Sequence, residues 1–328
     1  MTLGLAEDVS DPDGIGEDGL PEARGLPLLI HVGPHKTGTT WLQRRFFSNA
    51  RGLVYSGDFR KTHAAFLVPR FGDFDLGKVR GLFGPLIERA RSENLPLVIS
   101  DEALGGRPFH QKYYREITAY RLRRAFPEAK ILVTIREQDA VLRSMYGEYL
   151  RYGYSSSLRA FLTQDTGNPN LHPILDLAFY DYDRTLDFYE SLFGPAHVMA
   201  SPMEWVLSDK QAFVAHIGQF LGAEIGLPDD MDTDTRERPA WSGWARRAQR
   251  SINSLTPQDS RWQGGRNRFS ANSIAFRIDR ITPHWARMRG IAAEKRLVRD
   301  MIGSRFVASN RRLAERTGLD LGAFGYRV

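Results

Sequence analysis

The sequence predicts an α/β fold of the P-loop type in three layers, with a central, mainly parallel sheet flanked by helices and a helical C-terminal section. Short apolar runs alternate with helical patterns between residues 26 and 222, and this alternation is typical of βαβ units. The first apolar run leads through a glycine-containing turn into a helix, within residues 28–41. Because ligands of such sheets bind beyond the carboxyl ends of the strands, the residues after each strand are the candidate functional positions.

The elements follow from apolar runs and helical periodicity. After the first strand, the runs expected as strands are Leu95–Ser100, Lys130–Ile135 and His197–Ala200. The stretches expected as helices are 39–50, 78–93, 112–125, 139–151, 157–164, 182–193 and 209–221. A linker is expected over 223–238, and the last third is arginine-rich and mostly helical, with a break at 256–270.

Charge and composition divide the chain into three parts. Residues 1–25 form an acidic tail that we expect to be disordered, since seven of residues 1–24 are acidic and one is basic. Residues 26–222 form the α/β domain, and 223–328 form the C-terminal part of the same domain. Without residues 1–24, the chain keeps 44 of its 45 basic and 32 of its 39 acidic residues, a net charge of +12 in place of +6. A basic body suits an anionic nucleotide.

Several classes of protein are disfavoured by what the sequence lacks. It has no apolar run near 18 residues, which predicts no membrane-spanning helix, and its N-terminus does not read as a secretion signal. It has no cysteine, and its histidines show no metal-ligand spacing near carboxylates. These features predict a cytoplasmic protein without a metal site.

Residues 33–40, GPHKTGTT, form an expected cradle for a phosphate-like anion. The N–H groups at a helix start lack intrahelical partners, and the helix dipole adds positive charge there. Lys36 adds a full charge, and hydroxyl donors come from Thr37, Thr39 and Thr40. In the usual nucleoside-triphosphate loop a lysine follows the second glycine. Here Lys36 lies two residues before Gly38, which argues against ordinary ATP or GTP hydrolysis.

The stretch PHKTGTTWLQ resembles the 5′-phosphosulfate loop of sulfotransferases that use 3′-phosphoadenosine 5′-phosphosulfate (PAPS), with His35 as an insertion-like variation. The resemblance implies a phosphosulfate-binding role for residues 36–40. It also implies that Trp41 stacks on adenine, although a core aromatic that packs the helix on the sheet explains Trp41 equally well.

A second phosphate anchor is expected after the strand at 130–135. Arg136 stands at its carboxyl end, where a guanidinium can bind a phosphate through paired hydrogen bonds. Ser144 follows about two helical turns later. This pair resembles the 3′-phosphate site of PAPS sulfotransferases, although Glu137 and Gln138 replace the proline that is common there.

The catalytic base is expected near the strand that ends at Ser100. Transfer of a sulfuryl group to a hydroxyl needs a base for the acceptor proton and positive charge at the departing phosphate oxygen. Lys36 suits the second task, and Glu102 is the preferred base because glutamates have this role in carbohydrate-modifying relatives. His110 is the rival, since cytosolic relatives use a histidine.

The sequence therefore predicts a PAPS-dependent sulfotransferase that acts on a hydroxyl of a small molecule or glycan, most simply a carbohydrate or glycolipid. No nucleic-acid partner is expected. One alternative is an ATP-dependent small-molecule kinase, for which Asp101 could bind magnesium. Another is a non-catalytic protein that binds a nucleotide or nucleic acid, which the net charge permits.

Overall fold

The computed structural model describes residues 19–70, 72–106, 114–163, 175–227, 241–255 and 266–328. Contacts between residues divide the chain into two compact units. The first lies within residues 1–107, 112–135 and 184–233, and the second within 108–111, 136–183 and 234–328. The two units are described one at a time.

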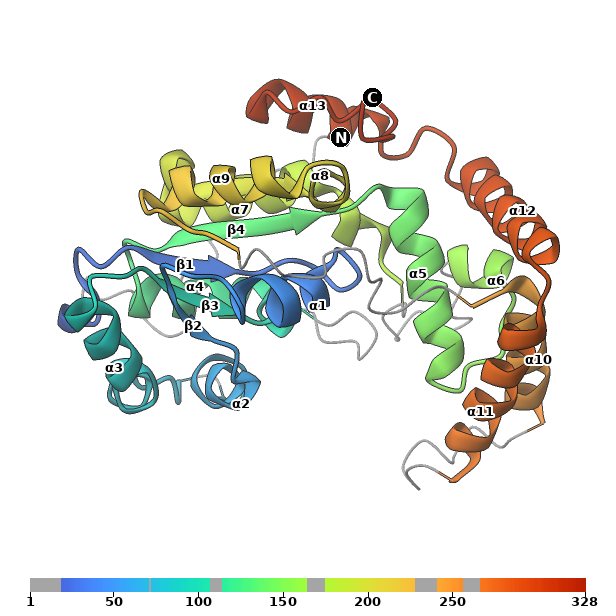
Figure 1. Cartoon of the computed structure of the whole chain (residues 1–328), viewed down its shortest axis with the longest axis horizontal. Helices are drawn as coiled ribbons and strands as arrows, with labels where there is room; N and C mark the ends of the chain where they lie inside the picture. Colours follow the sequence, from blue (N-terminus) through green and yellow to red (C-terminus); the bar gives the residue numbers. More distant parts are fainter. Residues whose placement is uncertain (1–18, 71, 107–113, 164–174, 228–240, 256–265) are drawn as a thin grey trace, which may run out of the picture. The chain divides into compact units, whose positions relative to one another are not determined.

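The first unit contains a five-stranded parallel sheet, as far as the described residues show, and the predicted fold class is confirmed (Figure 1). In chain order the strands are β1 (Leu28–His31), β2 (Val54–Ser56), β3 (Leu97–Ser100), β4 (Lys130–Ile135) and β5 (Val198–Pro202). Their order across the sheet is β2-β3-β1-β4-β5, so β1 is central. Every residue of β1 and β3 is buried, because helices cover both faces.

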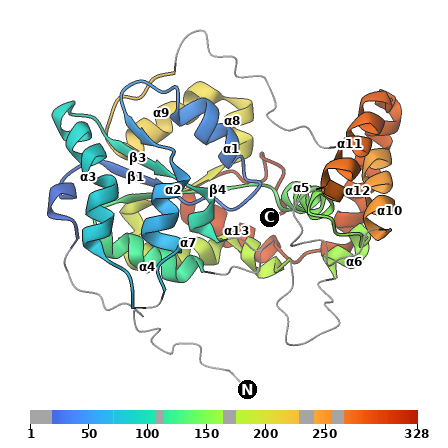
Figure 2. The same cartoon turned by 90° about the horizontal axis from the view of Figure 1, so that it is seen from below.

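One face of the sheet is covered by the helices that follow β1 and β5. These are α1 (Thr39–Trp41), the π-helical segment η2 (Leu42–Phe47), α8 (Met203–Ser208) and α9 (Lys210–Leu221). Phe46 of η2 meets Phe213 of α9 edge to face, with 5.8 Å between ring centroids. Leu29 and Leu132 belong to the same buried cluster. Figure 2 shows α8 and α9 on one side of the strands.

The opposite face carries α3 (Leu76–Ser92), α4 (Arg115–Ala125) and α7 (Tyr182–Phe193) (Figure 2). Between β2 and α3 lie α2 (Phe59–Thr62) and η3 (His63–Leu67). Phe66 packs against Phe83 and Phe126, with ring centroids about 6 Å apart. The buried guanidinium of Arg121 donates to the carbonyl oxygens of Phe66 and Arg70, so this arginine of α4 holds the C-terminal end of η3 and the residues after it.

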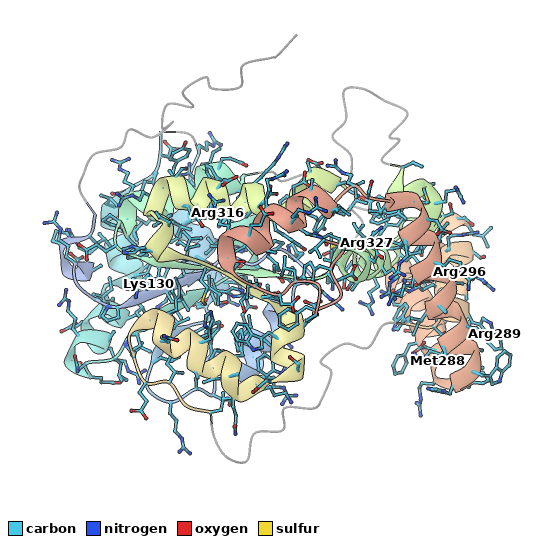
Figure 3. All side chains as sticks on the ribbon, turned by 90° about the horizontal axis from the view of Figure 1, so that it is seen from above. Lys130, Met288, Arg289, Arg296, Arg316 and Arg327 are labelled. Atoms are coloured by element: carbon cyan, nitrogen blue, oxygen red, sulfur yellow. The ribbon has the colours of Figure 1, made fainter. Side chains whose placement is uncertain are left out.

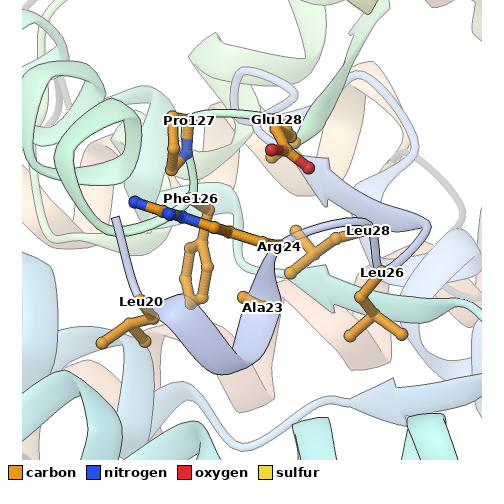
Figure 4. A pocket seen from close by; sticks show the side chains of 9 residues that line it. Leu20, Ala23, Arg24, Leu26, Leu28, Phe126, Pro127 and Glu128 are labelled. Atoms are coloured by element: carbon orange, nitrogen blue, oxygen red, sulfur yellow. The ribbon is translucent and has the colours of Figure 1, made fainter. Parts of the chain in front are cut away.

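Residues 19–25, assigned above to the acidic tail, are packed in the structure. Pro21–Ala23 form the 3₁₀ turn η1, and the Leu20 N–H donates to the Ala125 carbonyl at 2.9 Å. Leu20 lines a small, mostly apolar pocket together with Phe126 and Leu28 (Figure 4). That pocket lies at the amino ends of β1 and β4, the edge opposite to the one at which α/β sheets bind ligands.

The second unit is helical. Its helices are α5 (Gln138–Arg151), α6 (Leu158–Leu162), η6 (Leu177–Tyr180), α10 (Gly243–Ser254), α11 (Arg266–Ile281), α12 (His284–Ile302) and α13 (Val307–Thr317). Buried Arg246 of α10 pairs with Glu294 of α12 at 2.7 Å, which ties these two helices together. The outer surface of α12 exposes Met288, Arg289 and Arg296 (Figure 3).

The structure differs from the expected elements mainly in short pieces. Strand β2 and helices α2 and α8 were not expected, because three to six residues are too few to show a period. The helix expected at 39–50 begins at Thr39 but continues as the π-helical turn η2. Within the described residues, no helix combines the length and the apolar character that crossing a bilayer requires.

Candidate functional site

The loop between β1 and α1 begins at the carboxyl end of the central strand. Gly33 lies against β4, because a Cβ atom built on it would stand 1.8 Å from Thr134 Oγ1. Gly38 adopts a φ of 89° just before the helix, a conformation that glycine adopts without strain. Lys36 has a φ of 70°, which is rare and costly for a residue with a Cβ atom. The turn is therefore sharp and closely packed on its neighbours.

A chain of buried polar side chains fastens this loop to the sheet. His31, the last residue of β1, has Nδ1 2.7 Å from Ser100 Oγ of β3 and Nε2 3.0 Å from Thr134 Oγ1 of β4. Thr134 Oγ1 lies 2.9 Å from Thr37 Oγ1, and Thr37 donates to the Pro34 carbonyl at 2.6 Å. The three central strands thus contact the loop through one continuous set of hydrogen bonds.

One placement of the hydrogen atoms satisfies all of these hydrogen bonds. Thr37 uses its single hydrogen on Pro34, so Thr134 must donate to Thr37. Thr134 then has no hydrogen left for His31, so Nε2–H of His31 donates to Thr134, and in a neutral imidazole Nδ1 then accepts from Ser100. This pattern requires a neutral imidazole. Burial lowers the pKa of His31 to about 4, in agreement with that assignment.

Two carboxylates follow β3 at the same edge of the sheet. Asp101 caps the short helix η4 (Glu102–Gly105), since its Oδ1 accepts from the Ala103 N–H at 2.8 Å. Its Oδ2 accepts from the Thr62 hydroxyl and lies 3.3 Å from His63 Nε2. The Asp101 side chain is buried, with 4% of its surface exposed, and both of its carboxylate oxygens contact other groups of the protein.

Glu102 contacts the loop between β1 and α1 directly, and this loop is called the anion loop below after its expected ligand. Its Oε1 lies 3.1 Å from His35 Nδ1, and its Oε2 accepts from Thr39 Oγ1 at 2.6 Å. Burial raises the pKa of Glu102, but the hydrogen bonds from His35 and Thr39 and the charges of His35 and Lys36 outweigh it and lower the pKa to about 2. The structure thus brings Glu102, His35, Lys36 and Thr39 together at the carboxyl ends of β1 and β3.

The hydroxyl groups of the loop have different surroundings. Thr37 is fully buried, and its hydrogen goes to Pro34, while the hydrogen of Thr39 goes to Glu102. Thr40 is half-buried. In this state the donors best suited to an anion are therefore Lys36, the N–H groups of the first helical turn and the Thr40 hydroxyl.

Trp41 lies in the core between α1 and the sheet. It is 8% exposed, and its ring is nearly parallel to that of Phe46, with centroids 6.3 Å apart. This is the packing that a core aromatic requires. The adenine-stacking role remains a prediction that the fold does not test.

Arg136 and Ser144 belong to the second unit, where Arg136 directly follows the last residue of β4. The Arg136 carbonyl accepts from the Tyr182 hydroxyl at 2.9 Å, and Ser144 is half-buried on α5. Glu137 caps α5, because its carboxylate accepts from the N–H groups of Asp139 and Ala140.

The first turn of α5 is held by residues near the C-terminus, which sequence reasoning missed. Gln138 pairs with Asn310 at 2.7 Å, and buried Asp139 accepts from Arg327 at 2.6 Å. The signal available in the sequence was a run of polar residues where a helix begins beside a buried strand. These contacts fix the segment that carries Arg136 within its own unit.

Two of the predictions concern His110 and metal binding. His110 lies outside the described residues. In the parts of the chain that the structure describes, no group of three or more His, Asp or Glu side chains could hold a metal ion.

The protein has an α/β fold in which the central strand β1 leads through a P-loop-type turn into α1. Its structure is similar to that of a sulfotransferase from Alicyclobacillus acidocaldarius, with a TM-score of 0.54 and 17% sequence identity over 90% of this chain and 98% of the other. At this identity the match shows a shared fold, and the predicted resemblance to sulfotransferases is confirmed at the level of the fold. The sequence matches no protein-family model and no curated protein.

Proposed function

We propose that this protein transfers the sulfuryl group of PAPS to a hydroxyl of an acceptor and releases adenosine 3′,5′-bisphosphate. The observation that carries the proposal is the Lys36 loop at the carboxyl end of β1, in a fold shared with a bacterial sulfotransferase. Lys36 lies inside the turn and not on the first helical turn, which suits a phosphosulfate better than the γ-phosphate of ATP.

Each end of the nucleotide has its own proposed residues. Lys36 and the backbone N–H groups of residues 38–40 bind the 5′-phosphosulfate, with Thr40 as a hydroxyl donor. Arg136 and Ser144 bind the 3′-phosphate, because an arginine after a strand can place two parallel N–H groups on one phosphate. Trp41 is the candidate contact for adenine.

The reaction is an in-line displacement at sulfur. The acceptor oxygen forms a bond to sulfur as the bond from sulfur to the 5′-phosphate oxygen breaks, and the electron pair leaves on the phosphate. Lys36 stabilises that departing oxygen by its charge. The acceptor proton goes to a base at the loop, where Glu102 and its partner His35 are the candidates in the described residues. We propose a carbohydrate or glycolipid hydroxyl as the acceptor and the cytoplasm as the compartment.

The alternative of a magnesium-dependent kinase is disfavoured by Asp101. The acidic residue that would bind magnesium already accepts from Ala103 and Thr62 and contacts His63. A magnesium ion there would have to displace these partners. The sulfuryl transfer proposed here needs no such ion.

Calorimetry with adenosine 3′,5′-bisphosphate and with ATP–magnesium tests the proposal. We expect micromolar-range binding of the bisphosphate without metal, weakened at least about tenfold in Lys36→Ala and in Arg136→Ala. Lys78→Ala is the matched control, because Lys78 is an exposed lysine on α3. Tighter binding of ATP–magnesium would contradict the proposal. Transfer of labelled sulfate from PAPS to a panel of sugars, glycolipids and phenols then identifies the acceptor.

A further inference from the structure

The contact between His35 and Glu102 joins the anion loop to η4. His35 precedes Lys36, and its Nδ1 is 3.1 Å from Glu102 Oε1. The other oxygen of Glu102 accepts from Thr39 at 2.6 Å. Both carboxylate oxygens are therefore occupied by groups of the loop. The His35 side chain is still 19% exposed, so part of the ring reaches the surface.

This contact fixes the hydrogen on the imidazole of His35. Burial raises the pKa of Glu102, but its loop partners lower it to about 2, so the carboxylate is ionised near neutral pH. An ionised carboxylate only accepts hydrogen bonds, so Nδ1 of His35 must carry the hydrogen that lies between them. In a neutral imidazole the lone pair is then on Nε2, the atom that can take a proton.

Glu102 is by contrast poorly suited to take a proton itself. A general base is most effective when its pKa lies near the working pH. The hydrogen bonds that hold Glu102 in place also stabilise its ionised form, which lowers its basicity. Glu102 has the surroundings of a residue that orients and stabilises a neighbouring cation.

From this geometry we infer that His35 is the proton acceptor of the proposed sulfuryl transfer and that Glu102 is a positioning residue. The inference rests on the proposed function. The acceptor O–H proton moves to Nε2 of His35 while the acceptor oxygen bonds to sulfur and the S–O bond to the 5′-phosphate breaks. The imidazolium that forms donates through Nδ1–H to the Glu102 carboxylate. His35, which the sequence comparison treated as an insertion-like variation, is thereby proposed as the base.

The charges around the pair favour this division of roles. Glu102, on η4, stabilises an imidazolium at His35, whereas Lys36, next in the loop, opposes it. His31 at the end of β1 is neutral, and Asp101 at the start of η4 is held by Ala103, Thr62 and His63. Among the described residues, Glu102 is thus the carboxylate placed to stabilise the charge at His35.

The tautomer can be tested without an acceptor. In a long-range proton–nitrogen NMR spectrum of the full chain at neutral pH, we expect His35 to carry its hydrogen on Nδ1. Glu102→Gln should abolish this preference, because an amide can also donate to Nδ1. His35 is assigned by comparison with His35→Gln. A His35 ring that carries its hydrogen on Nε2 in the unmodified protein would overturn the inference.

Turnover then separates proton transfer from a merely structural role. The assay follows transfer from PAPS to the best acceptor of the panel, or PAPS hydrolysis with water as the acceptor. We expect His35→Ala to lose at least about a hundredfold in kcat and to regain part of it with added imidazole. The matched control His63→Ala removes a histidine that pairs with Asp101 but lies outside the loop, and it should keep most of its activity.

The pH profile distinguishes Glu102 from His35 as the base. With Glu102 as the base, kcat/KM should stay constant well into the acid range, because the pKa of Glu102 is lowered to about 2, so a loss of kcat/KM at less acid pH would point to a different base. Activity that persists down to the carboxylate range would return the role to Glu102. If His35→Ala binds adenosine 3′,5′-bisphosphate normally but is not rescued by imidazole, this inference fails while the proposed function stands. Absence of bisphosphate binding by the unmodified protein would reject the proposed function instead.

Discussion

His31 is the residue whose ionisation should affect stability most clearly. It is fully buried, and burial lowers its pKa from 6.5 to about 4. Between these values the unfolded chain binds a proton that the folded protein excludes, so folding is favoured above pH 6.5 and loses this contribution as the pH falls towards 4. At about 1.4 kcal/mol for each pKa unit, His31 alone should remove about 3 kcal/mol from the free energy of unfolding across that window.

Urea unfolding at about pH 7 and about pH 5 measures this effect. His31→Gln keeps a side chain that can contact Ser100 and Thr134 but cannot titrate, so the difference between the two pH values should shrink. His284→Gln is the control, because it removes an exposed histidine at the start of α12. Equal pH dependence in the unmodified protein and in His31→Gln would contradict the prediction.

Lys36 combines the charge proposed to bind the phosphosulfate with a strained backbone. Its φ of 70° costs a residue with a Cβ atom about 1 kcal/mol, and strain of this kind is often found where function requires a particular geometry. Lys36→Ala and Lys36→Gly both remove the charge, but only glycine relieves the strain. We expect equal losses of bisphosphate affinity by calorimetry, with the glycine variant about 1 kcal/mol more stable than the alanine variant.

Thermal unfolding of the two variants provides the comparison of stability. If the alanine variant is as stable as the glycine variant, the left-handed conformation at residue 36 is not costly in this loop. If only one of the two loses bisphosphate affinity, the backbone and not the charge determines binding. The pair therefore separates the two properties of this position.

At the scale of the elements, Gly33 allows the anion loop to pack closely against β4. A Cβ atom at this position would stand 1.8 Å from Thr134 Oγ1 and 2.8 Å from His31 Nε2, so Gly33→Ala must displace the hydroxyl that links the strand to Thr37. We expect a loss of about 1–3 kcal/mol in stability, as for other overpacked sites, together with weaker bisphosphate binding.

A second glycine provides the control for Gly33. Gly81 lies within α3, and a Cβ atom added there would meet nothing within 4 Å. Gly81→Ala should therefore stabilise the protein by up to about 1 kcal/mol, because alanine favours the helix interior. Thermal unfolding of both variants tests the contrast. A Gly33→Ala variant as stable as Gly81→Ala would show that Thr134 is not needed to hold the loop.

The elements that could be predicted from the sequence are those long enough to show a pattern. The strand at 130–135 and the helix at 182–193 have the bounds that the apolar runs and periodicity gave. Strand β2 has three residues, and its pairing with β3 depends on contacts distant in sequence. The π-helical form of η2 was also not predicted. Its side chains follow a helical pattern, and only its hydrogen bonds differ from those of an α-helix.

The candidate site was predictable residue by residue but not as an arrangement. Each of Lys36 and Glu102 stands after a strand, which a sequence can show. Lys36 and Glu102 lie close together because β1 and β3 are neighbours in the sheet. Their last residues, His31 and Ser100, are paired, so the two strands end side by side. Strand order is not visible in one sequence. The contact between His35 and Glu102 therefore appears only in the structure, and it changes the interpretation of both residues.

For the whole molecule, the net charge of +6 hides an uneven distribution. The acidic residues before Arg24 offset a strongly basic remainder, and most of the arginines beyond residue 236 whose side chains the structure describes lie on exposed helix surfaces such as that of α12 (Figure 3). Long-range attraction from such surfaces increases the rate at which anions arrive and is screened by salt. Discrimination between nucleotides must instead come from short hydrogen bonds at particular phosphates.

The two ends of the proposed nucleotide can be separated with simple fragments. Adenosine 5′-monophosphate presents only the phosphate assigned to the Lys36 loop, and adenosine 3′-monophosphate only the one assigned to Arg136 and Ser144. Loss of one charge-assisted contact costs about 1.5–3 kcal/mol, or about 10- to 150-fold in affinity. We expect Arg136→Ala to weaken the 3′-monophosphate and the bisphosphate by this factor and to spare the 5′-monophosphate, with Lys36→Ala showing the opposite pattern by calorimetry.

Arg136→Lys sharpens this last prediction, because lysine keeps the charge but loses the planar fork that binds a phosphate through two parallel bonds. Its affinity for the 3′-monophosphate should fall between those of the unmodified protein and Arg136→Ala. Raising the salt concentration should weaken all three ligands but leave the ranking of the variants unchanged, since screening acts on long-range attraction more than on close contacts. If Arg136→Ala weakens binding of the 5′-monophosphate as much as binding of the bisphosphate, Arg136 acts by long-range electrostatic attraction and does not contact the 3′-phosphate.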